Sequence, residues 1–447
     1  MKQDMTTGSS IKIITRFSAA VLIGNIFQQL YQMADTVIVG TILGVDALAA
    51  VGTTGPLQFL VIGSIIALCG GFGVPIAHFV GAKDDAGIRK CIVNAFFLCF
   101  VIALILMTIT MSSAGWMLRT MGTPENIFQD AYRYLIMIFL GIGAVMFYNL
   151  LLTISRAMGD VKTPLMFLII SSVLNFILAI LLVRYTPLGT MGAGMATALA
   201  QAISAIVYFI YMYRKYPVLH IKRKDCKIEF AIIKRLLLIG IPMSVQLSIT
   251  AVGAIVVQSA VNSLGSIVVA GVTASSRIQG VMIQAPEAMG ITMATFAGQN
   301  FGAGKIDRIK KGMQQSMVLM AGYSVIAFLI LHFLGGALTS LFVQGENPEL
   351  IYYTTQIMSL NGLFYMALGV LLILRNIIQG MGYATAAMIA GVGELVGRVF
   401  IALVLVRRWG FEAVRWSNPT AWILAAVLLI FMYIYVMNQI KKRPMYP

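Results

Sequence analysis

Long apolar segments follow one another along almost the whole chain, and no other feature restricts the possible fold as strongly. An α-helix that crosses a bilayer needs about 20 apolar residues, and twelve segments reach that length. Only 11% of the 447 residues are charged, whereas a soluble protein carries about a quarter. The sequence therefore predicts an all-α integral membrane protein with twelve transmembrane helices. The predicted spans are 14–40, 54–79, 91–113, 131–156, 164–185, 191–213, 233–263, 273–300, 313–336, 351–378, 384–406 and 418–439.

Lys and Arg are concentrated in alternate loops, and this distribution predicts the orientation. The net charge is +16, and cytoplasmic loops are the ones that carry excess Lys and Arg. The loops around Lys83, Lys305 and Lys441 are basic, which predicts a multi-pass protein of the cell (inner) membrane with both termini cytoplasmic. Arg407 and Arg408 lie on the opposite side and run against the rule. A nucleic-acid partner is not expected, because the basic residues sit in short loops between apolar segments.

The sequence holds no pattern typical of an enzyme or a metal site. There is no HExxH motif and no usefully placed GxSxG motif. The four cysteines, Cys69, Cys91, Cys99 and Cys226, lie in or beside predicted spans without metal-ligand spacing. We therefore expect no catalytic residue, no metal, no disulfide framework and no cofactor.

The chain contains an internal repeat. Gly81-Ala-Lys-Asp-Asp-Ala-Gly-Ile-Arg-Lys90 corresponds to Gly302-Ala-Gly-Lys-Ile-Asp-Arg-Ile-Lys-Lys311, 221 residues later. Two halves of six spans each share one orientation in the membrane, and parallel repeats of this kind are a transporter architecture. The predicted organisation is an N-terminal lobe over 1–213, a cytoplasmic linker over 214–232 and a C-terminal lobe over 233–447.

A polar stripe crosses the first predicted span. Asn25, Gln28, Gln32 and Asp35 follow one another at spacings of three, four and three, which places them on one side of a helix. An ionised carboxylate cannot face lipid without a cost of several kcal/mol or more. We therefore expect Asp35 to face a water-filled cavity and to take part in the protein's function. The alternative is a structural role, in which Asp35 only joins two helices.

Several motifs resemble those of the multidrug and toxic compound extrusion (MATE) transporters. They include Asp35-Thr-Val-Ile-Val-Gly40, Met158-Gly-Asp-Val-Lys-Thr-Pro164, Gly192-Ala-Gly-Met-Ala-Thr197 and Gly298-Gln-Asn-Phe-Gly-Ala-Gly304. Their order and spacing cover nearly the whole chain. The resemblance implies two six-helix bundles around a cavity and a secondary active antiporter. It also implies export of amphipathic, cationic drugs or metabolites in exchange for H⁺ or Na⁺.

The resemblance further implies an ion-coupling site in the N-terminal lobe, formed here by Asp35, Asn175 and Thr197. The family's second acid of this site would fall at Ala179. A hard cation such as Na⁺ prefers several oxygen ligands, including anionic ones, so the sequence favours H⁺ over Na⁺. Hydrogen bonding between helices is the structural alternative for Asn175 and Thr197.

The C-terminal lobe offers other charged residues near the predicted cavity. Glu394 and Arg398 lie four residues apart, which predicts an ion pair on one helix face. This pair is either a structural clamp or a substrate contact. Glu287 is an unpaired acid near the middle of its span and a candidate for binding cations. With Gln28 and Gln32, these three residues form the predicted substrate cavity.

Two functions fit the expected architecture. The first is drug export by alternating access of the two lobes. The second is a flippase for a lipid-linked saccharide or another lipid-like substrate, although such proteins tend to have more spans or strongly cationic cavities. In both cases the expected partners are a small-molecule substrate and the lipid bilayer, and the protein is expected to be a monomer.

Overall fold

The computed structural model describes residues 4–221, 225–340 and 347–442, and within the first helix only the backbone of residues 30–36. Throughout these ranges the secondary structure is helical, without strands. The longer helices are α1 (Ser10–Leu43), α3 (Gly55–Gly81), α4 (Asp85–Thr120), α7 (Lys162–Arg184), α8 (Thr190–Lys215), α9 (Phe230–Asn262), α12 (Ile306–Phe333) and α18 (Phe411–Lys442). The shorter ones are α2 (Val45–Thr53), α5 (Glu125–Leu140), α6 (Ile142–Ala157), α10 (Ser266–Met282), α11 (Gln284–Gly302), α13 (Gly335–Ser340), α14 (Pro348–Leu363), α15 (Tyr365–Gly380), α16 (Ala384–Phe400) and α17 (Val406–Trp409).

The helices bear out the predicted membrane fold. Within the described ranges, nine helices are long and apolar enough to cross a membrane, and three bent pairs raise the number to twelve. The bent pairs are α5 with α6 (47°), α10 with α11 (42°) and α14 with α15 (53°). They occupy the predicted spans 131–156, 273–300 and 351–378, which the sequence presents as single segments. Large apolar side chains such as Phe100, Val318 and Phe431 are more than 60% exposed, as expected of a surface that faces lipid.

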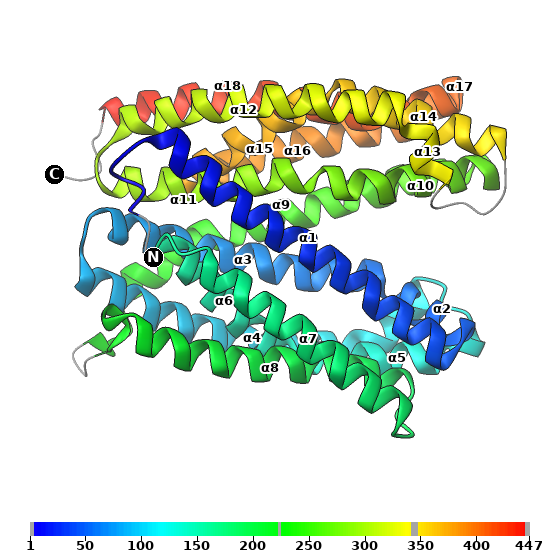
Figure 1. Cartoon of the computed structure of the whole chain (residues 1–447), viewed down its shortest axis with the longest axis horizontal. Coiled ribbons are helices and arrows are strands. Elements are labelled where there is room, and N and C mark those ends of the chain that lie inside the picture. Colours follow the sequence, from blue (N-terminus) through cyan, green and yellow to red (C-terminus); the bar gives the residue numbers. More distant parts are fainter. Residues whose placement is uncertain (1–3, 222–224, 341–346, 443–447) are drawn as a thin grey trace. The chain divides into compact units, whose positions relative to one another are not determined.

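The chain divides into two compact units of similar size. The first comprises Met1–Asp4 and Ile23–Ser244, and the second comprises Met5–Leu22 and Val245–Pro447. The helices α1 and α9, which are labelled in Figure 1, each contribute their first part to one unit and their remainder to the other. The predicted lobes follow the sequence repeat, whereas these units follow packing, so their boundaries fall at different residues.

Corresponding helices have corresponding partners in the two units. In the first unit α3 packs on α6, α7 on α8, and α5 on α8. In the second unit α11 packs on α15, α16 on α18, and α14 on α18. These are the same three pairs, one repeat apart. The duplication seen in the sequence is therefore a duplication of helix packing.

Backbone turns provide an independent record of the duplication. A positive φ is rare for residues other than glycine, yet four turns with positive φ occur at equivalent positions of the two halves. They pair Gly44 (89°) with Gly265 (99°), Lys83 (57°) with Gly304 (71°), Gly159 (80°) with Gly382 (92°), and Gly189 (55°) with Gly410 (53°). Lys83 adopts a conformation that its counterpart reaches with glycine.

The segment before α1 is fixed to the second unit. The backbone N–H of Met5 donates to Gln299 Oε1 at 3.1 Å, and the Met5 carbonyl accepts from Asn300 Nδ2 at 3.1 Å. Lys305 Nζ donates to the Thr6 carbonyl at 2.8 Å. The Arg308 guanidinium donates to the carbonyls of Met5, Thr7 and Gly8 at 3.1, 2.8 and 2.7 Å. Met5 is fully buried as a result.

The segment before α9 is fixed to the first unit in a comparable way. Asp225 accepts from Arg89 Nε at 2.8 Å, and Glu229 pairs with Lys90 at 2.8 Å. Asn94 donates to the Lys227 carbonyl and accepts from the Glu229 N–H. These residues lie in the linker predicted over 214–232, so part of that linker is packed against α4.

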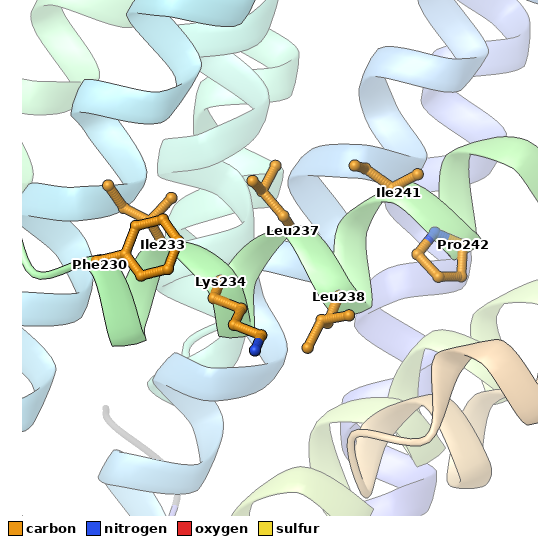
Figure 2. A pocket seen from close by; sticks show the side chains of 7 residues that line it. All are labelled: Phe230, Ile233, Lys234, Leu237, Leu238, Ile241 and Pro242. Carbon is orange, nitrogen blue, oxygen red and sulfur yellow. The ribbon is translucent and has the colours of Figure 1, made fainter.

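The first part of α9 carries a shallow apolar groove of about 300 Å³. Figure 2 shows that its lining residues follow a single helix. They are Phe230, Ile233, Lys234, Leu237, Leu238, Ile241 and Pro242. Lys234 is the one charged member of this set, and Phe230 and Leu238 are 79% and 58% exposed. A surface of this kind suits contact with lipid and holds no carboxylate for an ion-coupling site.

Candidate ion-coupling and substrate sites

Two of the three predicted ion-coupling residues lie together in the first unit. Asn175 on α7 donates from Nδ2 to Thr197 Oγ1 on α8 at 3.1 Å. Asn175 is buried, and its Oδ1 has no hydrogen-bond partner among the described residues. Thr197 in turn hydrogen-bonds the Ala193 carbonyl at 3.3 Å. The pair thus leaves one buried acceptor oxygen available for a donor.

The position of the expected second acid is apolar. Ala179 is fully buried and packs in a cluster with Ile38 and Ala196. A methyl group in place of the expected carboxylate supplies no anionic ligand at this position.

The side chains of Asp35 and Gln32 lie outside the described part of the structure. Their backbone belongs to α1, as predicted. Of the other two residues of the polar stripe, Asn25 is buried and Gln28 is exposed. The contacts of the predicted coupling carboxylate consequently remain a prediction.

The predicted ion pair of the C-terminal lobe is present, and it has a third member. Arg398 Nη2 lies 2.9 Å from Glu394 Oε1 on α16, and Arg375 Nη2 of α15 lies 2.9 Å from Glu394 Oε2. We refer to Arg375, Glu394 and Arg398 as the triad. The sequence alone did not indicate the contact of Arg375, because its partner lies on the next helix. A signal existed, since Arg375 is one of the few charges within an apolar span.

Further polar contacts between helices surround the triad. Gln379, one helical turn after Arg375, donates to Gln246 Oε1 at 2.6 Å, and Gln246 donates to the Ala387 carbonyl at 3.3 Å. Elsewhere in the same unit Asn361 donates to Gln279 Oε1 at 2.7 Å. Sequence reasoning missed both networks, because neutral amides are common in transmembrane helices and their pairing depends on tertiary packing.

Glu287 occupies the first turn of α11 and is not joined to the triad. Its side chain is exposed and makes no hydrogen bond or ion pair within the described ranges. Arg277 on α10 is likewise exposed and outside any ion pair that the described residues form. The structure therefore groups Glu394 and Arg398 but keeps Glu287 apart from them.

The duplicated bundles and the polar groups within their spans define a class, the polytopic membrane transporters built from parallel repeats. The family model MatE matches residues 20–181 and 242–404, once in each half. The chain belongs to the MATE family of transporters.

Curated relatives and solved structures agree with this assignment. A "Probable multidrug resistance protein YpnP" of Bacillus subtilis is 29% identical over 385 residues, covering 85% of this chain and 84% of the relative. A "Multidrug export protein MepA" of Staphylococcus haemolyticus is 24% identical over 439 residues, covering 97% and 95%. An outward-facing multidrug resistance MATE transporter has the same fold, with a TM-score of 0.91 at 20% identity over 98% of both chains. These relatives are named as transporters, which points to transport and not to catalysis.

Proposed function

We propose that the protein is a secondary active antiporter that exports amphipathic, cationic drugs or metabolites across the cell membrane in exchange for H⁺. Its membership of the MATE family carries this proposal, and its relatives bear names that refer to multidrug export and resistance. The two units would provide alternating access. The flippase alternative has less support, because these relatives are named for drugs and not for lipids.

The contacts around Asn175 support proton coupling over sodium coupling. Ala179 and its apolar neighbours leave a Na⁺ ion with Asp35 as the single anionic ligand of the predicted set. A proton needs only one carboxylate. The Oδ1 of Asn175 has no hydrogen-bond partner among the described residues and can accept a hydrogen bond from a protonated carboxyl group. Thr197 can donate to an ionised one. Asp35, Asn175 and Thr197 would thus respond to protonation as a unit.

Transport by purified protein in proteoliposomes tests the proposal. We expect a pH gradient to drive uptake of a cationic dye such as ethidium, and a Na⁺ gradient at fixed pH to have no effect. Asp35→Asn mimics the protonated side chain and should abolish this transport. The matched control is Asp307→Asn, which removes an exposed carboxylate that pairs with Lys310 at the start of α12.

Two results would contradict proton coupling. One is full pH-driven transport by a correctly inserted Asp35→Asn protein. The other is wild-type transport that follows the Na⁺ gradient and ignores the pH gradient. In that second case Ala179→Asp, which restores the family's second acid, should strengthen the dependence on Na⁺.

A further inference from the structure

The triad of the second unit carries a net charge within the membrane-spanning region. Two guanidinium groups face one carboxylate, so the triad has a charge of +1 when all three side chains are ionised. Glu394 is 4% exposed and lies about ten residues, or roughly 15 Å, along α16 from its start. Among the residues that the structure describes, no second acid pairs with either arginine.

A net charge in this position is costly unless something neutralises it. One Arg and one Glu would form a neutral pair, which can be buried far more cheaply than a single charge. A structural clamp requires only one arginine to neutralise Glu394, so the second arginine needs another explanation. In addition, Nε of Arg375 and Nε of Arg398 are buried without a hydrogen-bond partner in the described part of the chain. An unpaired buried donor normally costs about 1–3 kcal/mol.

The side chains of both arginines are partly accessible. The Arg375 and Arg398 side chains keep 14% and 12% of their surface exposed, compared with 5% for Glu394. Gly253 of α9 lies directly against Arg398, and a Cβ at this position would approach Arg398 Cδ to 3.1 Å. A larger residue would press on the arginine, so glycine keeps this side of the guanidinium stem uncrowded.

We infer that the triad is an anion-binding site that holds the carboxylate or phosphate group of an amphipathic substrate. A guanidinium group presents several N–H donors in a fixed plane and binds planar oxyanions with two hydrogen bonds. The bound anion would bring the triad to neutrality, and Glu394 would hold the two arginines apart in fixed positions. Glu394 is thus a positioning residue, whereas Arg375 and Arg398 are the groups that contact the ligand.

This inference rests on the proposed export function and narrows its substrate class. The preferred compounds would carry a cationic, apolar body together with an anionic group, which makes them zwitterions. Simple organic cations would bind less tightly, because the second unit would offer them an unneutralised positive charge. The inference concerns binding alone, so it can be tested without a gradient.

Equilibrium binding of two matched dyes to the full-length protein in nanodiscs of neutral lipid tests the inference. Rhodamine 110 has a free carboxylate, and rhodamine 123 is its methyl ester, so the pair differs only in the anionic group. Fluorescence anisotropy should show that the wild type binds rhodamine 110 at least tenfold more tightly. That ratio corresponds to about 1.4 kcal/mol.

Arg375→Gln and Arg398→Gln are the informative variants, because each leaves a neutral Arg–Glu pair in place. Either one should remove the preference for rhodamine 110, because rhodamine 110 loses a guanidinium partner and rhodamine 123 no longer meets a net positive charge. Arg277→Gln is the matched control, since it removes an exposed arginine of α10 in the same unit. This control should keep the preference. If one triad variant fails to fold, the other provides the same test.

Three outcomes would overturn the inference. The first is equal binding of the two dyes by the wild type. The second is an unchanged preference in both triad variants. The third is loss of binding of both dyes in both variants, which would indicate a structural clamp.

Adding anionic phosphatidylglycerol to the nanodiscs distinguishes lipid from substrate. Suppression of rhodamine 110 binding by this lipid would assign the site to a lipid headgroup and contradict a substrate site. If the protein failed to transport in proteoliposomes but still preferred rhodamine 110, the result would count against the export function and not against the anion-binding site.

Discussion

Asp160 of the first unit is a carboxylate that accepts several hydrogen bonds. It lies in the turn between α6 and α7, fully buried, and accepts from the Thr163 hydroxyl at 2.5 Å and from Lys215 Nζ at 2.9 Å. The Tyr216 hydroxyl also donates to it. Burial by itself would raise the pKa of Asp160, but the hydrogen bonds from Lys215, Thr163 and Tyr216 outweigh it and hold the pKa at about 2. One carboxylate thus fixes this turn to the end of α8.

Removing the Asp160 charge should destabilise the protein in a way that depends on pH. A pKa lowered from 3.8 to about 2 means that the ionised form stabilises the fold by roughly 2 kcal/mol. This contribution is complete above about pH 5 and is lost as the pH falls toward 2. We expect Asp160→Asn to lower the apparent melting temperature in detergent by a few degrees at pH 7. The gap to the wild type should narrow below about pH 4.

Asp307→Asn is again the control, because the Asp307 side chain is 96% exposed and its pair with Lys310 is on the surface. Its melting temperature should match the wild type at every pH. A gap between wild type and Asp160→Asn that stays constant down to pH 3 would show that the carboxylate charge is not what stabilises the turn.

The contacts of individual residues were predictable only where the partner is close in the sequence. The Glu394–Arg398 pair follows from a spacing of one helical turn and is present at 2.9 Å. Arg375 reaches the same carboxylate from another helix, and Lys215 reaches Asp160 from 55 residues away. No local pattern encodes such contacts. Asn175 and Thr197 were placed by resemblance to a family, and their hydrogen bond agrees with that placement without testing their role.

At the scale of elements, the segment before α1 owes its structure to one side chain more than to any other. Arg308 donates to three backbone carbonyls of residues 5–8. Hydrogen bonds from a charged donor are worth about 1.5–3 kcal/mol each. We predict that Arg308→Gln releases this segment. Hydrogen exchange followed by mass spectrometry should show amide exchange of residues 5–9 at least ten times faster than in the wild type.

Lys311→Gln provides the comparison for Arg308→Gln. Lys311 is exposed on the same helix and takes part in no ion pair that the described residues form. Exchange in residues 5–9 should be unchanged in this variant. Equal protection in Arg308→Gln and wild type would mean that Gln299, Asn300 and Lys305 hold the segment without the guanidinium.

The elements themselves were largely predictable, and their bends were not. Hydropathy locates each span because a membrane helix must be apolar along about 20 residues. The break between α5 and α6 falls at Gly141, where a Cβ would lie 2.9 Å from Ala198 Cβ. Glycine is frequent throughout these spans, so its presence at 141 did not distinguish a bend from a close helix contact. The break between α14 and α15 falls beside Phe364 and has no comparable signal.

At the scale of the whole molecule, the internal repeat could be recognised from the sequence because the two halves share residues at equivalent positions. The motif that begins at Gly81 and its copy that begins at Gly302 both have a positive φ at their third residue, Lys83 and Gly304. The exact boundary between the compact units was not visible. It depends on which unit the two parts of α1 and of α9 pack against, and no local sequence pattern marks that division.

The basic residues that run against the predicted orientation have a partial structural account. Arg415 lies in the same predicted loop as Arg407 and Arg408. Its Nη1 donates to both carboxylate oxygens of Glu412, at 2.8 and 2.7 Å, so its charge is largely compensated. Arg407 and Arg408 occupy the last turn of α17, where the partial negative charge of a helix C-terminus stabilises a cation. Neither arrangement requires this side of the membrane to be cytoplasmic. The remaining Lys and Arg distribution still predicts cytoplasmic termini.

The native cysteines allow that orientation to be tested without altering the linker. Cys69, Cys91 and Cys99 are buried, whereas Cys226 is exposed in the segment before α9. An impermeant maleimide added to intact cells should therefore leave the protein unlabelled, and permeabilised cells should show labelling at Cys226. Cys226→Ser should abolish that labelling.

A cysteine on the opposite side of the membrane completes the test. Asn126 is exposed near the start of α5, and one span separates it from the basic loop at Lys83. Asn126→Cys in the Cys226→Ser background should therefore react in intact cells. Labelling of Cys226 in intact cells would reverse the predicted orientation of all twelve spans, and with it the assignment of both termini to the cytoplasm.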